Sequence, residues 1–147
     1  MIKLTGVMLS FLLFFGFSHV IAKECHLPEV LSNKRILLEV DLFYQPSNPD
    51  AGGLKALTFS GNIISDITLE TGENNQGTFQ YTRLKPYVAV LKVALNQGPK
   101  MSESEITLVC DTPLTGLYIY TQVKGSIKPD LRHNLGSYMI TNKIDKP

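Results

Sequence analysis

The sequence contains no tryptophan, and its 147 residues include only two cysteines and three histidines. Positive and negative side chains are nearly balanced, with 14 Lys and Arg against 13 Asp and Glu, and they are spread along the chain without a basic stripe. Nucleic-acid binding requires clustered basic residues that displace counterions from phosphates, and attraction to an anionic membrane requires a similar cluster. The composition therefore argues against a nucleic-acid partner and against a basic membrane-binding surface.

The familiar signatures of catalytic and metal sites are also missing. The sequence has no H-x-H, H-x-x-x-H or C-x-x-C spacing, no G-x-S-x-G elbow and no phosphate-binding glycine loop. We therefore predict no metal, no cofactor and no catalytic residue. The alternative left open is a small secreted hydrolase centred on His133, assembled with Asp130 and a serine. The segment 129–134 that contains these residues is otherwise expected to be a solvated loop.

Long apolar runs are absent except at the N-terminus. There, Lys3 precedes an apolar run over 4–17, and Val20 and Ala22 occupy positions −3 and −1 of a cut before Lys23. This arrangement is typical of a secretory signal peptide. The run is shorter than the roughly 20 apolar residues of a membrane span, which disfavours an uncleaved anchor. We expect residues 1–22 to be removed as a signal helix, leaving a secreted or periplasmic chain without a membrane span.

The two cysteines, Cys25 and Cys110, lie in the part of the chain expected to be exported. In an oxidising compartment, two cysteines in one domain most simply form a disulfide. Cys110 falls on the same face as Ile106 and Leu108 of an expected strand, so it should point into the core. The bridge would hold the new N-terminus against this strand. A catalytic or intermolecular thiol is the alternative.

After residue 22, apolar side chains recur at every second position, and β-branched and aromatic residues fill the runs. Breaks rich in Gly, Pro and Asn, such as 45–53 and 71–77, separate these runs. The segment 87–96 is almost wholly apolar, as expected of a central strand covered on both faces. The expected strands are 35–44, 54–60, 62–70, 78–84, 87–96, 106–111, 117–124 and 137–143.

No capped amphipathic helix of ten or more residues is expected in the exported part. Seven or eight short strands separated by turns predict a single all-β domain over 23–147, either an antiparallel sandwich or a barrel. We favour an immunoglobulin-like sandwich, although its Cys…Trp…Cys pattern is absent, and we keep the barrel as the alternative.

The most suggestive surface is expected on the strand 117–124. Alternation there would turn Leu117, Ile119, Thr121 and Val123 toward the core and leave Tyr118, Tyr120, Gln122 and Lys124 outside. Tyrosine is favoured at interfaces because it buries a large area with few rotors. We therefore expect a non-enzymatic protein that binds a protein or glycan partner, such as an inhibitor, an immunity-type protein or an adhesive envelope subunit. The sequence names neither the partner nor the oligomeric state.

Overall fold

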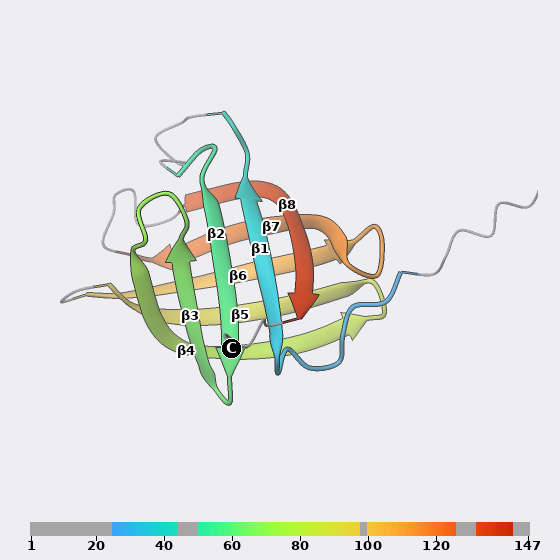
Figure 1. The fold of residues 1–147 in the computed structure, drawn as a ribbon. Helices are drawn as coiled ribbons and strands as arrows, with labels where there is room; N and C mark the ends of the chain where they lie inside the picture. The colour runs from blue at the N-terminus through green and yellow to red at the C-terminus, as the bar shows by residue number, and fades with distance from the viewer. Residues whose placement is uncertain (1–24, 44–49, 98–99, 126–131, 143–147) are drawn as a thin grey trace, which may run out of the picture.

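The computed structural model describes residues 25–43, 50–97, 100–125 and 132–142. The expected signal peptide and its cut between Ala22 and Lys23 lie outside these residues, as does Asp130. Within them the chain forms eight antiparallel strands that close into one barrel (Figure 1). The strands are β1 (Lys34–Val40), β2 (Leu54–Ser60), β3 (Ile63–Thr68), β4 (Asn74–Lys85), β5 (Val88–Gln97), β6 (Lys100–Cys110), β7 (Thr115–Lys124) and β8 (Arg132–Asn142).

Each strand pairs with its neighbour in the sequence, and the circle closes where β1 pairs with β8. At this seam Lys34 lies opposite Asn142, and the Lys34 Nζ donates a hydrogen bond of 2.9 Å to the Asn142 Oδ1. The structure thus confirms the all-β prediction and adopts the barrel that stood as the alternative to the sandwich. A barrel and a sandwich share the same alternation of side chains, and only the β1–β8 pairing separates them here.

Alternation along the strands decides which side chains fill the barrel. On β1 the even-numbered residues Ile36, Leu38 and Val40 are buried inside, while Glu39 is exposed. Tight connections keep neighbouring strands in register. The turn between β2 and β3 contains Gly61 at a φ of 58°, a left-handed conformation that glycine adopts without steric cost.

One end of the barrel is sealed by residues 25–33, which precede β1 and are called the sealing segment. In Figure 1 this segment runs past the β4–β5 turn before it enters β1. Leu27 and Leu31 are fully buried in the apolar core, and the Leu27 backbone N–H donates to the Pro86 carbonyl at 2.7 Å. The Tyr81 hydroxyl donates to the Pro28 carbonyl at 2.8 Å. Both apolar burial and hydrogen bonds therefore fix the segment across the opening.

The predicted disulfide is present between Cys25 and Cys110, whose Cα atoms lie 6.0 Å apart. Cys110 points inward and packs against the core, as the alternation of its strand predicted. The bridge joins the start of the sealing segment to the end of β6. It is compatible with an extracellular or periplasmic location, since disulfides persist in oxidising compartments.

The apolar core extends from this seal through the barrel as far as Leu95, near the end of β5. Phe59 and Phe79 contact each other edge to face, with ring centroids 4.9 Å apart. The buried apolar residues around them include Leu27, Leu31, Ile36, Leu38, Leu57, Ile64, Ala89, Leu91, Ile106, Leu108, Tyr138 and Ile140. These side chains come from both the strands and the sealing segment, so seal and barrel share one core.

Several local predictions differ from the structure. β4 begins at Asn74 rather than at residue 78, within the expected break 71–77, and β6 begins at Lys100 rather than at residue 106. Two further differences concern β5 and β8. β5 is covered on one face only: Leu91 and Val93 are buried, whereas Lys92 between them is exposed on the outer wall. The last strand begins at Arg132 rather than at residue 137, so residues 132–134 are part of β8 and not a solvated loop. Both differences follow from closure, because a barrel has one buried face per strand and pairs every strand with two neighbours.

Candidate functional site: a polar cavity at the open end

A cavity of about 100 Å³ lies inside the barrel at the end opposite the seal. Apolar side chains such as Leu95 and Ile106 form part of its wall. The rest of the lining is polar and comes from strands all around the barrel and from the connections at its open end. The polar members are Asp50, Lys55, Asp66, Thr68, Glu73, Asn75, Ser104, Tyr118, Tyr120, Arg132 and Asn134.

An ion-pair cluster forms one side of the cavity. The Lys55 Nζ lies 3.8 Å from the Asp66 carboxylate and 3.8 Å from that of Asp50. Burial is the largest single influence on the pKa of the Lys55 ammonium and acts to lower it, but Asp66, Asp50, Tyr120 and Glu73 together raise this pKa above its usual value. Burial also raises the pKa of Asp66, and Lys55 offsets this only in part. The Asp66 Oδ1 atom is buried and has no hydrogen-bond partner among the described residues.

Arg132 also lines the cavity and is only 5% exposed. Its Nη2 donates a hydrogen bond of 2.7 Å to the Oε1 of Gln122, which lies opposite it on β7 and is itself buried. The Nε and Nη1 atoms of Arg132 are also buried, but they have no hydrogen-bond partner among the described residues. The guanidinium is therefore held in place by one amide and leaves two nitrogens unsatisfied.

Tyr120 and Ser104 complete the polar lining. Burial raises the pKa of the Tyr120 phenol, while its hydrogen bond to Ser104 and the charges of Lys55 and Arg132 act in the opposite direction. The phenol is thus kept neutral and surrounded by two cations. Neutral hydroxyls of this kind can orient a bound polar group by hydrogen bonds.

Inside the barrel, two tyrosines of β7 and β8 each lie opposite a glycine of the neighbouring strand. Tyr118 lies opposite Gly136, and Tyr138 lies opposite Gly116. A Cβ atom added at residue 136 would come within 2.9 Å of the Tyr118 ring, and one at residue 116 within 2.8 Å of the Tyr138 hydroxyl. Each glycine therefore leaves room for the tyrosine that faces it. Glycine inside a strand commonly allows another group to approach the backbone closely.

The predicted orientation of strand β7 is wrong. Tyr118 is 2% exposed and points into the barrel with Tyr120 and Gln122, whereas Leu117 and Ile119 are 63% and 53% exposed on the outer wall. The physical reason is that polar residues line the open half of the barrel, so the more apolar face of β7 is the outer one. The expected outward ladder of Tyr118, Tyr120 and Gln122 does not exist, and their binding role stays a prediction that would operate from inside.

Two further predicted residues lie on the outside. Lys124 is exposed at the end of β7, where its Nζ lies 3.8 Å from a Glu103 carboxylate oxygen on β6. His133 is exposed on β8, and its Nδ1 lies 3.2 Å from the Thr121 hydroxyl. None of the salt bridges among the described residues involves His133, so a hydrolase centred on it stays an untested prediction.

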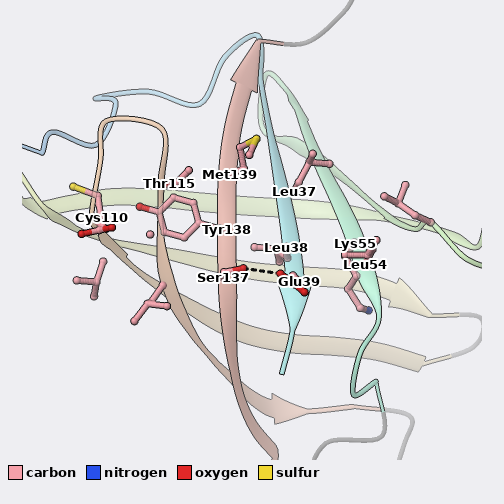
Figure 2. A pocket seen from close by; sticks show the side chains of 15 residues that line it. Leu37, Leu38, Glu39, Leu54, Lys55, Cys110, Thr115, Ser137, Tyr138 and Met139 are labelled. Atoms are coloured by element: carbon pink, nitrogen blue, oxygen red, sulfur yellow. Dashed lines mark hydrogen bonds between the residues drawn. The ribbon is translucent and has the colours of Figure 1, made fainter. Parts of the chain in front are cut away.

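The outer wall carries a second hollow, which is apolar and has a volume of about 730 Å³. Figure 2 shows Leu37, Leu54 and Met139 around strands β1, β2 and β8, with the Ser137 hydroxyl donating to the Glu39 carboxylate at 3.0 Å. Outside the hollow, Ile119 and Leu135 extend the apolar surface along β7 and β8. By contrast, the outward residues of β4 include Gln76, Thr78, Gln80 and Thr82. The barrel wall is therefore apolar on one side and polar on the other.

Sequence reasoning missed the cavity residues Lys55, Asp66 and Arg132. A signal for the first two is present, because each shares a strand face with buried apolar residues such as Leu57 and Ile64. For Arg132 the sequence gives no such signal, because its neighbours in the sequence are mostly polar and no strand was expected there. Among the described residues, no group of His, Cys, Asp and Glu side chains is arranged to hold a metal ion, and no helix has the length and apolar character needed to cross a membrane.

Comparisons of this chain with protein-family models, with curated proteins and with solved structures find no match.

Proposed function

We propose that this protein is an exported, non-enzymatic binding protein whose barrel holds a small polar ligand at its open end. The observation that carries the proposal is the contrast within the interior: one end is sealed by Leu27 and Leu31, and the other contains a cavity lined by Lys55, Asp66 and Arg132. Buried charges cost stability unless they are compensated, and replacing them by apolar residues is often neutral or favourable. A ligand-binding role explains why they are present.

The size of the cavity limits what it holds. Sites that enclose a drug-sized ligand have volumes of roughly 300–1,000 Å³, and this cavity has about 100 Å³. It therefore accepts a molecule of a few non-hydrogen atoms, or the end group of a larger one. The glycan expected from the sequence would enter by an end group only.

Export supports the same role. The N-terminal segment 1–22 has the pattern of a signal peptide, and the Cys25–Cys110 disulfide suits an oxidising compartment. Binding of a small molecule by the barrel needs no cofactor, so it can take place in a secreted or periplasmic protein. The expected mature N-terminus is Lys23, which intact-mass measurement of the exported protein would detect.

The function is tested by NMR titration of the ¹⁵N-labelled mature protein with lactate, alanine, lactamide and glycerol at millimolar concentrations. We expect at least one probe to shift the amide signals of Lys55, Ser104 and Arg132 but not those near Leu27. Ser104→Leu, which fills the cavity, should abolish the shifts, and Ser137→Leu on the outer wall should preserve them. Absence of shifts with every probe would refute small-ligand binding in this cavity.

A second candidate function, binding of a protein partner, is favoured by the apolar outer wall around Leu117, Ile119 and Met139. A second copy of this chain is the partner we propose, because the exposed apolar side chains of this wall meet without repulsion between like charges. Sedimentation of the mature protein should then show a dimer that Leu117→Asp dissociates, while Thr78→Asp on the polar wall leaves it intact. A monomer at all concentrations would contradict this function.

A further inference from the structure

The side chain of Arg132 is the most unusual group in the described part of the protein. It is 5% exposed, its Nε and Nη1 atoms are buried without hydrogen-bond partners, and none of the described ion pairs involves it. An arginine side chain keeps its proton under all ordinary conditions, so it cannot escape burial by becoming neutral. A buried cation in this state requires an anion to compensate it.

The geometry of the guanidinium indicates which kind of anion fits. Gln122 occupies one hydrogen of Nη2 and fixes the plane of the group. A guanidinium presents an oxyanion with two edges, Nε–Nη2 and Nη1–Nη2, and each edge of Arg132 contains one unsatisfied nitrogen. Two parallel N–H···O bonds to a carboxylate are the arrangement that such an edge forms most readily.

The other charges of the cavity favour a singly charged ligand. Asp50, Asp66 and Glu73 also line the cavity, and they would repel a dianion such as phosphate or sulfate. The Asp66 Oδ1 is buried and unsatisfied, so a hydrogen-bond donor on the ligand would complete it. The cavity of about 100 Å³ has room for both groups only if they belong to a small molecule.

From these observations we infer that the ligand is a small monocarboxylic acid carrying a hydroxyl or amino group, with its carboxylate on Arg132 and its donor on Asp66. This inference rests on the proposed binding function and specifies its ligand class. Gln122 acts as a positioning residue, because it holds the guanidinium and lies outside the cavity lining. Hydroxy acids and amino acids share this chemistry, and the test separates them.

The test uses the mature, disulfide-bonded protein and measures affinities by calorimetry or NMR titration. Lactate represents the hydroxy acids and alanine the amino acids, while acetate lacks the donor, lactamide lacks the carboxylate and sulfate carries two charges. We expect lactate or alanine to bind about tenfold to a hundredfold more tightly than lactamide, as for hydrogen bonds to a charged group. Acetate and sulfate should both bind more weakly than the better of the two acids.

Substitutions at Arg132 provide the decisive comparison. Arg132→Gln should weaken binding of the better acid at least tenfold, and Arg132→Lys should also weaken it because lysine lacks the planar edge. Arg35→Gln, on the outer wall near the sealed end, is the matched control and should not change affinity. Because Arg132→Gln removes a buried charge that has no ion-pair partner among the described residues, its melting temperature without ligand should be equal to or above that of the natural protein.

The outcomes separate this inference from the function on which it rests. If lactamide or glycerol binds in the cavity as tightly as the acids, or if Arg132→Gln leaves acid binding unchanged, the carboxylate assignment is wrong and small-ligand binding stands. If none of the probes binds in the cavity, both are wrong. If Asp130→Asn raises the affinity for all anions equally, Asp130 and not a ligand compensates Arg132, and the assignment is again wrong.

Discussion

The two ends of the barrel interior are built from different chemistry. At the sealed end, Leu27 and Leu31 pack with the core, and a disulfide and backbone hydrogen bonds hold their segment in place. At the open end, the charged residues Lys55, Asp66 and Arg132 line a cavity. Burial of apolar area contributes about 25 cal/mol per Å² to stability, whereas buried charges contribute little or nothing net. The comparison indicates that the sealed end contributes most of the stability of the fold and that the charged residues of the open end contribute little to it.

Among the changes that test this contrast, removal of the disulfide should have the largest effect on the free energy of unfolding. Cys25 and Cys110 are separated by 85 residues, and the chain-entropy model assigns a loop of that length about 4–5 kcal/mol. We expect the Cys25→Ala, Cys110→Ala double variant to lose about 4 kcal/mol in free energy of unfolding, as measured with urea. A loss below about 1 kcal/mol would show that the sealed end does not depend on its covalent link.

The apolar contacts of the sealing segment come next. Leu27→Ala removes a fully buried side chain and should cost about 2–5 kcal/mol in the same measurement. Val30→Ala, in the same segment but 64% exposed, is the matched control and should change stability by less than about 0.5 kcal/mol. Equal effects of the two variants would mean that the segment does not pack into the barrel as described.

The buried tyrosines make the stability of the protein depend on pH, and they lie in both the sealed and the open half of the barrel. Burial raises the pKa values of Tyr118 and Tyr138 well above the usual value of about 10. Above that pH the unfolded chain releases protons that the folded chain retains, so stability is complete below pH about 10 and falls as pH rises. Each phenol should contribute a loss of about 1.4 kcal/mol per pH unit.

Urea unfolding between pH 9 and 11 measures this slope. Tyr138→Phe and Tyr118→Phe should each reduce it, and phenolate absorbance should appear only as the protein unfolds. Absorbance that rises before unfolding would indicate that the phenols are accessible to solvent in the folded barrel.

The smallest effect is expected at the open end. Replacing the ion pair by apolar residues, in the Lys55→Met, Asp66→Leu double variant, should change the free energy of unfolding by no more than about 1 kcal/mol in either direction. The same variant should lose ligand binding. A loss of several kcal/mol would mean that the pair stabilises the barrel, which would remove the distinction between the two ends.

The sequence was sufficient where apolar residues face inward. On β1 the alternation of apolar Ile36, Leu38 and Val40 with charged Glu39 matches the observed burial of the strand. The inward position of Cys110 and its disulfide followed from the same rule. In this half of the molecule, burial and hydrophobicity coincide, so the pattern indicates the face.

The same rule assigned the two faces of β7 the wrong way round, because the inward residues of this strand at the open end are polar. Cys110 pairs with Gly116, so 118, 120 and 122 share the face of Cys110. This information depends on the length of the turn between β6 and β7, and a shift of one residue in the register exchanges the two faces of a strand. Closure of the barrel was equally undetermined, since it depends on the pairing of Lys34 with Asn142 at opposite ends of the described chain.

The closed circle of eight strands also restricts how a partner can be bound. Every described strand pairs along both of its edges, so this part of the backbone offers no free N–H and C=O row to which an incoming strand could be added. Assembly by strand addition, which many adhesive subunits would use, requires such an edge. If the barrel binds a partner, its described strands can therefore contribute side chains to the contact but no free strand edge.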